Sequence, residues 1–248
     1  MNLASGSSTL EVMEGAHRYN RWIYDRVRAG LGQRILEIGC GTGTITTFLV
    51  DRQLVVGIDV VDHYIRSTGE RYRGRPNIVI RRHDLTESIE PLREYRFDSA
   101  LSVNVFEHIA NDEAAMKAVY ALLEPGGTFT VLVPCHPALL GPFDHDIGHH
   151  RRYTKGELRR KLEVSGFVVE RIRRSNPVGA LGWLVNVRLL RLRRLRGANL
   201  FDQMVPALAV LDRVELPVGL SLIAVARKPA VGAETRRPDR RAAPGDAA

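Results

Sequence analysis

The stretch Arg34-Ile-Leu-Glu-Ile-Gly-Cys-Gly-Thr-Gly43 decides the fold of this chain. Its first five residues are mostly apolar and predict a short buried strand. The glycines at 39, 41 and 43 predict a tight turn whose backbone a ligand can approach closely. A helix over 44–52 is expected to follow. Strand, glycine turn and helix in succession predict a binding site at the carboxyl end of a parallel strand.

The same alternation continues along the chain. Apolar periodicity predicts further strands and helices, with a helix before the first strand and a polar loop after the fifth. The expected strands are 54–59, 77–81, 97–103, 128–133, 167–173 and 221–227, the expected helices are 10–30, 62–73, 112–123 and 154–165, and a turn is expected at 124–127. Thr154 with Glu157 reads as a helix-capping pair. Strands alternating with helices predict an α/β fold with a mostly parallel sheet.

The glycine turn differs from the common phosphate-binding turns. It lacks the Gly-Lys-Ser/Thr of a P-loop, and its Gly-x-Gly-x-Gly spacing differs from the Gly-x-Gly-x-x-Gly of dinucleotide sites. Glu37 just before it would repel a pyrophosphate, and Asp59 ends the next strand, where an acid can accept both hydroxyls of a ribose. These residues suit a ligand that carries an ammonium group and no phosphate, such as the methionyl end of S-adenosylmethionine.

With these motifs the sequence resembles the class I S-adenosylmethionine-dependent methyltransferases. The similar segments are 37–43, Asp59, Asp84 within 82–85, 97–109 and 123–127. The resemblance implies S-adenosyl-L-methionine as cofactor. It also implies a Rossmann-like, seven-stranded, mostly parallel sheet with an antiparallel last strand and helices on both faces. The residues it assigns to the cofactor are Glu37, Gly39, Gly41, Gly43, Asp59, Val60, Asp84, Leu85 and Asn104.

The predicted organisation is one methyltransferase domain over 10–228. A helical insertion or lid over 176–220 separates the sixth and seventh strands, and the ends 1–9 and 229–248 are expected to be disordered. No apolar stretch predicts a signal peptide or a membrane span. With two cysteines and no disulfide framework, the expected location is the cytoplasm.

The loop after the fifth strand is the expected acceptor region and holds four of the eight histidines. Its pattern Asp144…Gly148-His149-x-Arg151-Arg152-Tyr153-Thr154 resembles a bacterial branch of small-molecule methyltransferases found with antibiotic and cell-envelope genes. His149 or His145 is predicted to act as base or to orient the acceptor, and His108 is a third catalytic candidate; the alternative is that these residues only pin the loop to the next helix. The residues expected to bind the acceptor are Tyr19, Trp22, His136, Asp144, Tyr153 and Trp183.

A metal site is weighed at Glu107 and His108. Ubiquinone-type O-methyltransferases have a similar Glu-x-x-Glu-His pattern, but here Asn104 replaces the first glutamate. Loss of that carboxylate weakens the ligand set. The sequence therefore predicts no metal at this point and favours an ordinary strand-to-helix turn.

The positive charge is confined to one region. The chain carries a formal net charge of +8, whereas residues 151–200 alone carry +11. The Arg-rich apolar run 181–196 suits a hydrophobic lid, or a weak peripheral contact with a membrane. It lacks the interleaved aromatic residues expected for single-stranded nucleic acid, so no nucleic-acid partner is expected. The oligomeric state is left open.

The predicted function is methyl transfer to a small-molecule acceptor in secondary or cell-envelope metabolism. O-methylation is favoured because histidines suit deprotonation, with N- and C-methylation open. The alternatives are a lipid-linked or prenylated acceptor at a membrane surface, a non-catalytic S-adenosylmethionine-binding protein, and a macromolecular acceptor. The last is disfavoured because Asn104 is not followed by Pro-Pro-Tyr/Phe.

Overall fold

The computed structural model describes residues 14–176, 202, 203, 205 and 219–230. The predicted N-terminal disorder over 1–9, nearly all of the 176–220 insertion, Trp183 and the tail from 231 lie outside these residues. Within them, no helix is long and apolar enough to cross a membrane.

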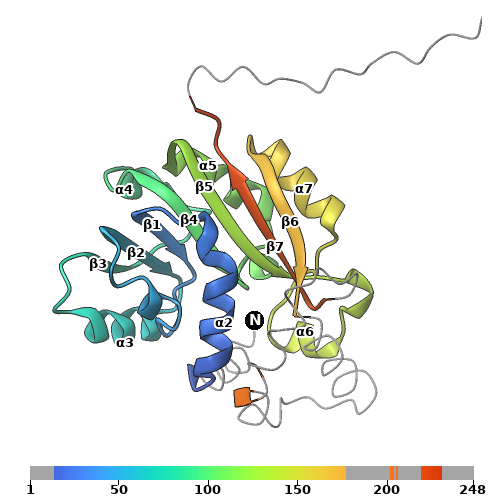
Figure 1. Cartoon of the computed structure of the whole chain (residues 1–248), viewed down its shortest axis with the longest axis horizontal. Helices are drawn as coiled ribbons and strands as arrows, with labels where there is room; N and C mark the ends of the chain where they lie inside the picture. The colour runs from blue at the N-terminus through green and yellow to red at the C-terminus, as the bar shows by residue number, and fades with distance from the viewer. Residues whose placement is uncertain (1–13, 177–201, 204, 206–218, 231–248) are drawn as a thin grey trace, which may run out of the picture.

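A seven-stranded sheet forms the centre of the molecule (Figure 1), with the strand order β3-β2-β1-β4-β5-β7-β6. The strands are β1 (Arg34–Ile38), β2 (Leu54–Asp59), β3 (Ile78–Arg82), β4 (Phe97–Val103), β5 (Leu123–Pro134), β6 (Val168–Ser175) and β7 (Ser221–Arg227). The pairings from β3 to β5 are parallel, and β7 is antiparallel to both of its neighbours. This confirms the predicted α/β fold and its antiparallel last strand.

Helices cover both faces of the sheet because neighbouring strand residues point to opposite sides. On one face α2 (His17–Val27) and α3 (Asp62–Tyr72) pack on residues such as Ile35 and Val55. On the other, α5 (Asp112–Leu122) and α7 (Lys155–Val164) pack on residues such as Leu36 and Val56. Burial on both faces explains why the parallel strands are continuously apolar.

The carboxyl ends of β1 to β5 meet at one edge of the sheet because these strands are parallel. Several chain segments turn sharply there through left-handed backbone. Gly39 follows β1 with φ +71°, Asn104 follows β4 with φ 53° and His136 follows β5 with φ 64°. Left-handed non-glycine residues store strain and concentrate at functional sites, so this edge is where a site is expected.

Three local predictions were wrong. The expected helix over 44–52 is a single 3-10 turn, η2 (Thr46–Phe48), because this stretch is rich in β-branched residues and the Thr46 hydroxyl is bonded to Glu37. The expected turn at 124–127 lies inside β5, which is longer than predicted. The loop after β5 contains a short helix, α6 (Pro142–Asp146), that the sequence pattern did not indicate.

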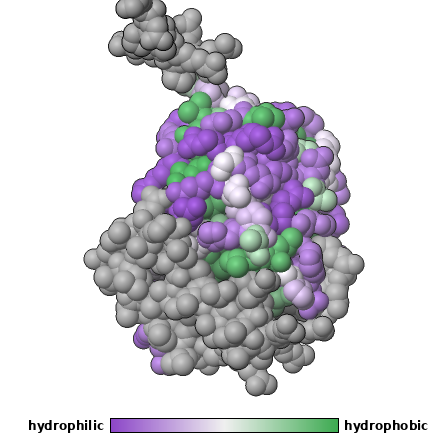
Figure 2. Space-filling model, turned by 90° about the vertical axis from the view of Figure 1, so that its right-hand side faces the viewer, coloured by the Kyte–Doolittle hydropathy of each residue, from purple (hydrophilic) through white to green (hydrophobic). Residues whose placement is uncertain are grey.

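Charged side chains on the outer strand β6 disfavour its pairing with another sheet. Arg171, Arg173 and Arg174 interrupt its apolar pattern, and most of its residues are partly or fully exposed. Charged side chains on an edge strand oppose pairing with another sheet. Figure 2 shows the side of the molecule on which β6 and α7 lie: its described surface is mostly hydrophilic, and a small hydrophobic area borders the grey atoms.

Candidate active site

The glycine turn after β1 is held in place by the next strand. The backbone N–H groups of Gly39 and Cys40 both donate to Ile58 O, at 2.8 and 3.0 Å. A Cβ at Gly39 would lie 2.3 Å from Val105 Cγ2, and one at Gly43 would lie 2.8 Å from Thr68 Cγ2. Because all three turn glycines have positive φ, side chains here would add strain as well as clashes.

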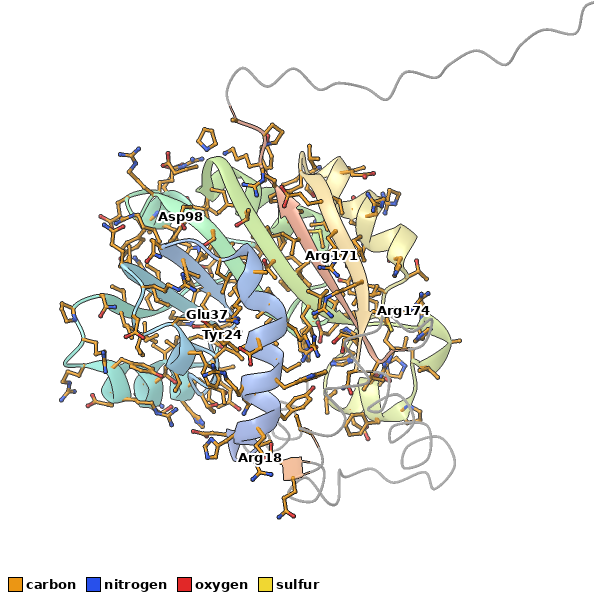
Figure 3. All side chains as sticks on the ribbon, in the orientation of Figure 1. Arg18, Tyr24, Glu37, Asp98, Arg171 and Arg174 are labelled. Carbon is orange, nitrogen blue, oxygen red and sulfur yellow. The ribbon has the colours of Figure 1, made fainter. Side chains whose placement is uncertain are left out.

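Glu37 is a buried carboxylate at the end of β1. It accepts a hydrogen bond from Thr46 Oγ1 at 2.7 Å. Burial raises the pKa of Glu37 to about 7, although the bond from Thr46 opposes this shift. Figure 3 labels Glu37 to the left of α2 and below Asp98, which lies at the start of β4. A half-neutralised acid beside the glycine turn favours a cationic ligand group over an anionic one.

Asp59 joins the turn to the end of β2. Its Oδ2 accepts the N–H of Gly41 at 2.9 Å, and its Oδ1 accepts the N–H of Val61 at 3.0 Å. Each carboxylate oxygen can accept a further bond. The carboxylate therefore fixes the turn and still has capacity for hydroxyl groups of a ligand.

The remaining predicted cofactor residues follow the neighbouring strands. Asp84 comes after β3 and accepts the N–H and hydroxyl of Thr86, each at 2.8 Å. Leu85 beside it is buried, Val60 is half exposed, and Asn104 is exposed directly after β4. The predicted cofactor residues thus follow β1, β2, β3 and β4 at one edge of the sheet.

This donor set fits S-adenosylmethionine. Its methionyl end carries an ammonium group that suits Glu37, and its ribose hydroxyls suit Asp59. Asp84 and Leu85, beyond β3, offer an acceptor and an apolar surface for the adenine. No phosphate-binding lysine is present at the turn. The chemistry of the residues therefore agrees with the cofactor that the sequence implies.

A second polar cluster lies in the loop after β5. Asp144 is fully buried, and its Oδ1 accepts His149 Nδ1 at 2.9 Å and the Arg152 guanidinium at 2.7 Å. Its Oδ2 accepts the N–H of Gly141 at 3.0 Å. Burial alone would raise the pKa of Asp144, but the bonds from His149 and Arg152 lower it. A charged Asp144 therefore fixes the orientation of the His149 ring.

Glu107 and His108 come from the turn after β4, the 3-10 helix η3 (Phe106–His108), and face this loop. His149 Nε2 lies 3.8 Å from Glu107 Oε1, and the rings of His108 and His149 meet edge to face at 4.7 Å. Burial raises the pKa of Glu107 to about 8 and lowers that of His108 to about 4. One ligand atom from each of the three residues lies within 4.8 Å of the others, so together they could hold a metal ion.

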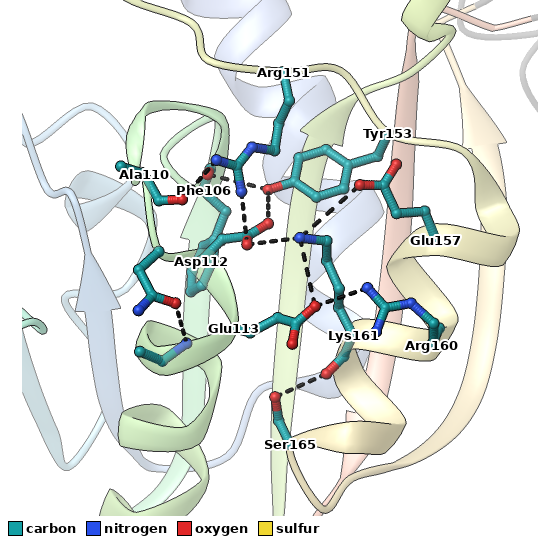
Figure 4. A network of polar contacts seen from close by, with 12 residues as sticks. Phe106, Ala110, Asp112, Glu113, Arg151, Tyr153, Glu157, Arg160, Lys161 and Ser165 are labelled. Atoms are coloured by element: carbon teal, nitrogen blue, oxygen red, sulfur yellow. Dashed lines mark hydrogen bonds and ion pairs between the residues drawn. The ribbon is translucent and has the colours of Figure 1, made fainter.

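Behind this cluster, a buried ion network ties the loop to α5 and α7 (Figure 4). Asp112 lies 2.6 Å from Arg151, 2.7 Å from Lys161 and 2.7 Å from the Tyr153 hydroxyl. The Tyr153 hydroxyl also lies 3.1 Å from Phe106 O. Burial would raise the pKa of Asp112, but these bonds lower it. The network fixes the loop against the turn that carries Glu107.

The other predicted acceptor-side residues occupy different settings. Tyr19 and Trp22 pack together on α2 with ring centroids 5.7 Å apart, and Trp22 Nε1 is buried without a hydrogen-bond partner in the described part of the chain. His136 Nε2 is likewise buried and unpartnered among the described residues. His145 has an exposed side chain on α6. The structure therefore brings His149 and His108 together and leaves His145 exposed on α6.

The sequence did not reveal that Asp112 and Lys161 take part in this site, and Glu107 was considered only as a metal ligand and Arg152 only as part of the loop pattern. Each of the four is buried and carries an ionisable side chain. They belong to three segments, 107–112, 144–152 and 161, that meet only in the fold. The one available signal was the pair of acids at 107 and 112 facing a basic segment from 151 onward.

Comparison with known proteins finds methyltransferase relatives for part of the chain. A family model described as "Methyltransferase domain" matches residues 36–131. An S-adenosyl-L-methionine-dependent Diels-Alderase of Talaromyces variabilis is 31% identical over 106 residues, covering 41% of this chain and 36% of that protein. A Mycolicibacterium smegmatis protein named as a probable S-adenosylmethionine-dependent methyltransferase is 30% identical over 147 residues, covering 56% and 53%. The chain thus spans about half or less of these relatives.

Solved structures share the fold across most of the chain. An S-adenosylmethionine-dependent methyltransferase from Mesorhizobium loti aligns with a TM-score of 0.57 at 22% identity, covering 82% of this chain and 96% of that one. The [4+2]-cyclase SpnF aligns with a TM-score of 0.60 at 19% identity, covering 86% and 82%. These solved structures are below 25% identity and show the shared fold. Residues 36–131 are similar to methyltransferase domains, and the S-adenosylmethionine in the names of the relatives agrees with the donor set at the glycine turn.

Proposed function

We propose that this chain transfers a methyl group from S-adenosylmethionine to a hydroxyl of a small-molecule acceptor. The observation that carries the proposal is the glycine turn at 39–43, with Glu37 buried beneath it and Asp59 bonded to its backbone. When bound, the cofactor supplies an electrophilic methyl on a sulfonium. The chain's own contribution is to bind and align, which can account for much of the acceleration of such a displacement.

On the cofactor side, each role follows from the side chain that is present. Glu37 would hold the ammonium group, and Gly39, Gly41 and Gly43 would let the backbone approach the methionyl part. Asp59 would accept the ribose hydroxyls. The adenine would lie against Val60, Asp84 and Leu85, with Asn104 closing the site from the end of β4.

On the acceptor side, His149 and His108 would lie at the reacting hydroxyl and orient it. Asp144 and Tyr153 are fully buried and bonded within the protein, so they would position the loop rather than touch the acceptor. Tyr19, Trp22 and His136 would line the acceptor, where the unpartnered Trp22 Nε1 and His136 Nε2 could bond it. His145, being exposed, has a weaker case than His149.

A small acceptor is favoured over a nucleic acid by the state of the basic segment. Three of its described cations form buried or partly buried ion pairs: Arg151, Arg152 and Lys161. Arg160 pairs with Glu113 at 2.7 Å. Cations held in this way are not available to the phosphate backbone that dominates nucleic-acid affinity.

A second candidate is cofactor binding without methyl transfer. It is favoured by the names of two similar proteins, a Diels-Alderase and a [4+2]-cyclase. In that case the cofactor would help to shape the pocket and would leave unchanged.

The test is calorimetric binding of S-adenosylmethionine, followed by a screen of phenolic and hydroxy-acid acceptors with labelled methyl. Saturable binding with label in an O-methyl product supports the proposal. Binding with a converted acceptor but no label transfer would favour the second candidate. No binding at millimolar cofactor would contradict both.

A further inference from the structure

Glu107, His108 and His149 form a compact group of metal-binding side chains, named here the Glu107 cluster. Two of them come from η3 after β4, and the third follows α6. Their candidate ligand atoms all lie within 4.8 Å of one another. The backbone also ties the two segments together, because the N–H of His150 donates to Glu107 O at 2.8 Å.

Both imidazoles of the cluster are held in the orientation that a metal requires. His149 Nδ1 lies 2.9 Å from a carboxylate oxygen of Asp144, which can only accept. His108 Nδ1 lies 3.2 Å from Gly148 O, which also can only accept. Each ring therefore carries its hydrogen on Nδ1 and leaves the Nε2 lone pair available. A carboxylate or carbonyl behind a histidine is the usual support of a metal-bound ring.

Glu107 provides the second, independent observation. Its side chain is fully buried, and neither Oε1 nor Oε2 has a hydrogen-bond partner in the described part of the chain. The Nε2 atom of His149 lies 3.8 Å from Glu107 Oε1. A buried carboxylate without partners is costly, and a cation placed between Glu107 and the two imidazoles would remove that cost.

We propose that the Glu107 cluster binds one divalent transition-metal ion of the zinc type. Two imidazole nitrogens and one carboxylate form the ligand set of many open, catalytic zinc sites. Nitrogen ligands disfavour magnesium and calcium, which prefer oxygen. Three protein ligands leave at least one position open for a ligand from solution.

The function of this ion rests on the proposed methyl transfer. A hydroxyl bound at the open position would release its proton to solvent more readily. Its oxygen would then form a bond to the methyl carbon as the carbon–sulfur bond breaks, which leaves S-adenosylhomocysteine. The ion would therefore select acceptors with a hydroxyl that can coordinate it.

Metal binding can be tested without cofactor or acceptor. The full chain is freed of metal with a chelator, which is then removed, and is titrated with Zn²⁺ by calorimetry and with Co²⁺ by visible absorption. We expect one equivalent of Zn²⁺ to bind with a micromolar or lower Kd, and Mg²⁺ to bind far more weakly. The Co²⁺ spectrum should show nitrogen and oxygen ligands in a site of low coordination number.

Variants locate the ion. Glu107→Gln, which keeps the shape and removes the charge, and His149→Ala should each weaken Zn²⁺ binding by about a hundredfold or more. Asp144→Asn, which only supports His149, should weaken it by about tenfold to a hundredfold. His150→Ala is the matched control, because this neighbouring histidine has an exposed side chain and should leave the Kd unchanged. Circular dichroism reports whether each variant folds.

Two results would contradict the proposed metal site. One is the absence of stoichiometric Zn²⁺ or Co²⁺ uptake by the metal-free chain. The other is equal uptake by the parent, Glu107→Gln and His149→Ala. Should Glu107→Gln fail to fold, the Co²⁺ spectrum of His149→Ala decides. Loss of metal binding with intact S-adenosylmethionine binding would refute this site alone and leave the proposed function standing.

Discussion

Two loops leave the same edge of the sheet, and they are built in opposite ways. The glycine turn after β1 is held mainly by backbone hydrogen bonds, with Asp59 and Glu37 as its acids. The loop after β5 is held by buried charges, chiefly Asp144 with Arg152 and Asp112 with Lys161. The first is one contiguous motif, to which we assign the cofactor. The second is assembled from distant segments, and we assign the acceptor to it.

This difference predicts which substitutions should disrupt each loop. A turn fixed by its own backbone conformation should be sensitive to added atoms and tolerant of changes elsewhere. A loop fixed by buried ion pairs should be sensitive to the loss of one charge, because the remaining partner is left uncompensated. Four predictions test this contrast.

The largest effect is expected in the glycine turn. Gly39→Ala should abolish measurable S-adenosylmethionine binding, because its Cβ would lie 2.3 Å from Val105 Cγ2 at a residue with φ +71°. Adding Val105→Ala should restore part of the affinity, since only the cost of the positive φ, about 1 kcal/mol, then remains. Gly69→Ala is the control, because a Cβ there meets nothing within 4 Å. Calorimetry compares the variants, and full binding by Gly39→Ala would contradict the packing described.

The next effect is expected in the ion network. Asp112→Asn should destabilise the fold by about 3 kcal/mol, because Arg151 and Lys161 would lose their shared carboxylate. The adjacent Glu113→Gln should leave the denaturation midpoint nearly unchanged, because Glu113 pairs at 2.7 Å with the exposed Arg160 and lies only at 3.8 Å from Lys161, which keeps Asp112. Urea unfolding measures both. Equal effects at the two positions would remove the distinction between buried and surface charge.

A smaller effect is expected at Asp59. Asp59→Asn should weaken S-adenosylmethionine binding about tenfold to a hundredfold, since a bond to a charged acceptor is worth about 1.5–3 kcal/mol. Asp62→Asn is the control: Asp62 lies 3.4 Å from Arg82 with a mostly exposed side chain. Calorimetry with S-adenosylmethionine measures both, and unchanged affinity in Asp59→Asn would remove Asp59 from the cofactor site.

The smallest effect is a pH dependence set by Glu37. Burial raises the pKa of Glu37 to about 7, above its ordinary value, so the free protein holds a proton there below that pH. A cationic ligand favours the carboxylate, and binding must then release the proton. Affinity for S-adenosylmethionine should therefore rise with pH up to about 7, by at most about tenfold per unit, and level off above it.

Calorimetry in two buffers of different ionisation enthalpy would count the released proton. Glu37→Gln should bind more weakly and lose the pH dependence below 7. A pH dependence that persists in this variant would assign it to another group.

The strands of the sheet could be predicted from the sequence because each buried strand is a short apolar run. The strands 34–38, 54–59, 97–103 and 221–227 were predicted with the bounds that the structure has. The helix expected over 44–52 was wrong because tertiary bonding of Thr46 outweighs the local pattern. The extension of β5 through Gly126 and Gly127 was missed for a similar reason: backbone hydrogen bonds join both residues to Lys228, which is distant in the sequence.

The candidate site likewise has a part that local sequence predicts and a part that only the fold brings together. The glycine turn and Asp59 could be predicted because strand, turn and acid follow one another at fixed spacing. The environment of His149 could not, because Glu107 and Asp144 are separated by more than thirty residues in the sequence and meet only when β4 and β5 pair. Nor could burial be foreseen at Asp112 and Lys161, which are residue types usually found in solvent.

The pairing of β7 has a consequence for how this chain could diversify. Ser221 is paired with Ser175 on one side and with Pro134 on the other, and Leu220 N donates to Asn176 O at 3.0 Å. Residues 176 and 220 are thus neighbours across one strand spacing. A segment whose two ends are this close can be lengthened, shortened or exchanged at little entropic cost and without shifting the register of any strand. Because Leu220 O accepts the N–H of Cys135 at the start of the loop after β5, such exchange would begin and end next to that loop and would leave the glycine turn after β1 unchanged.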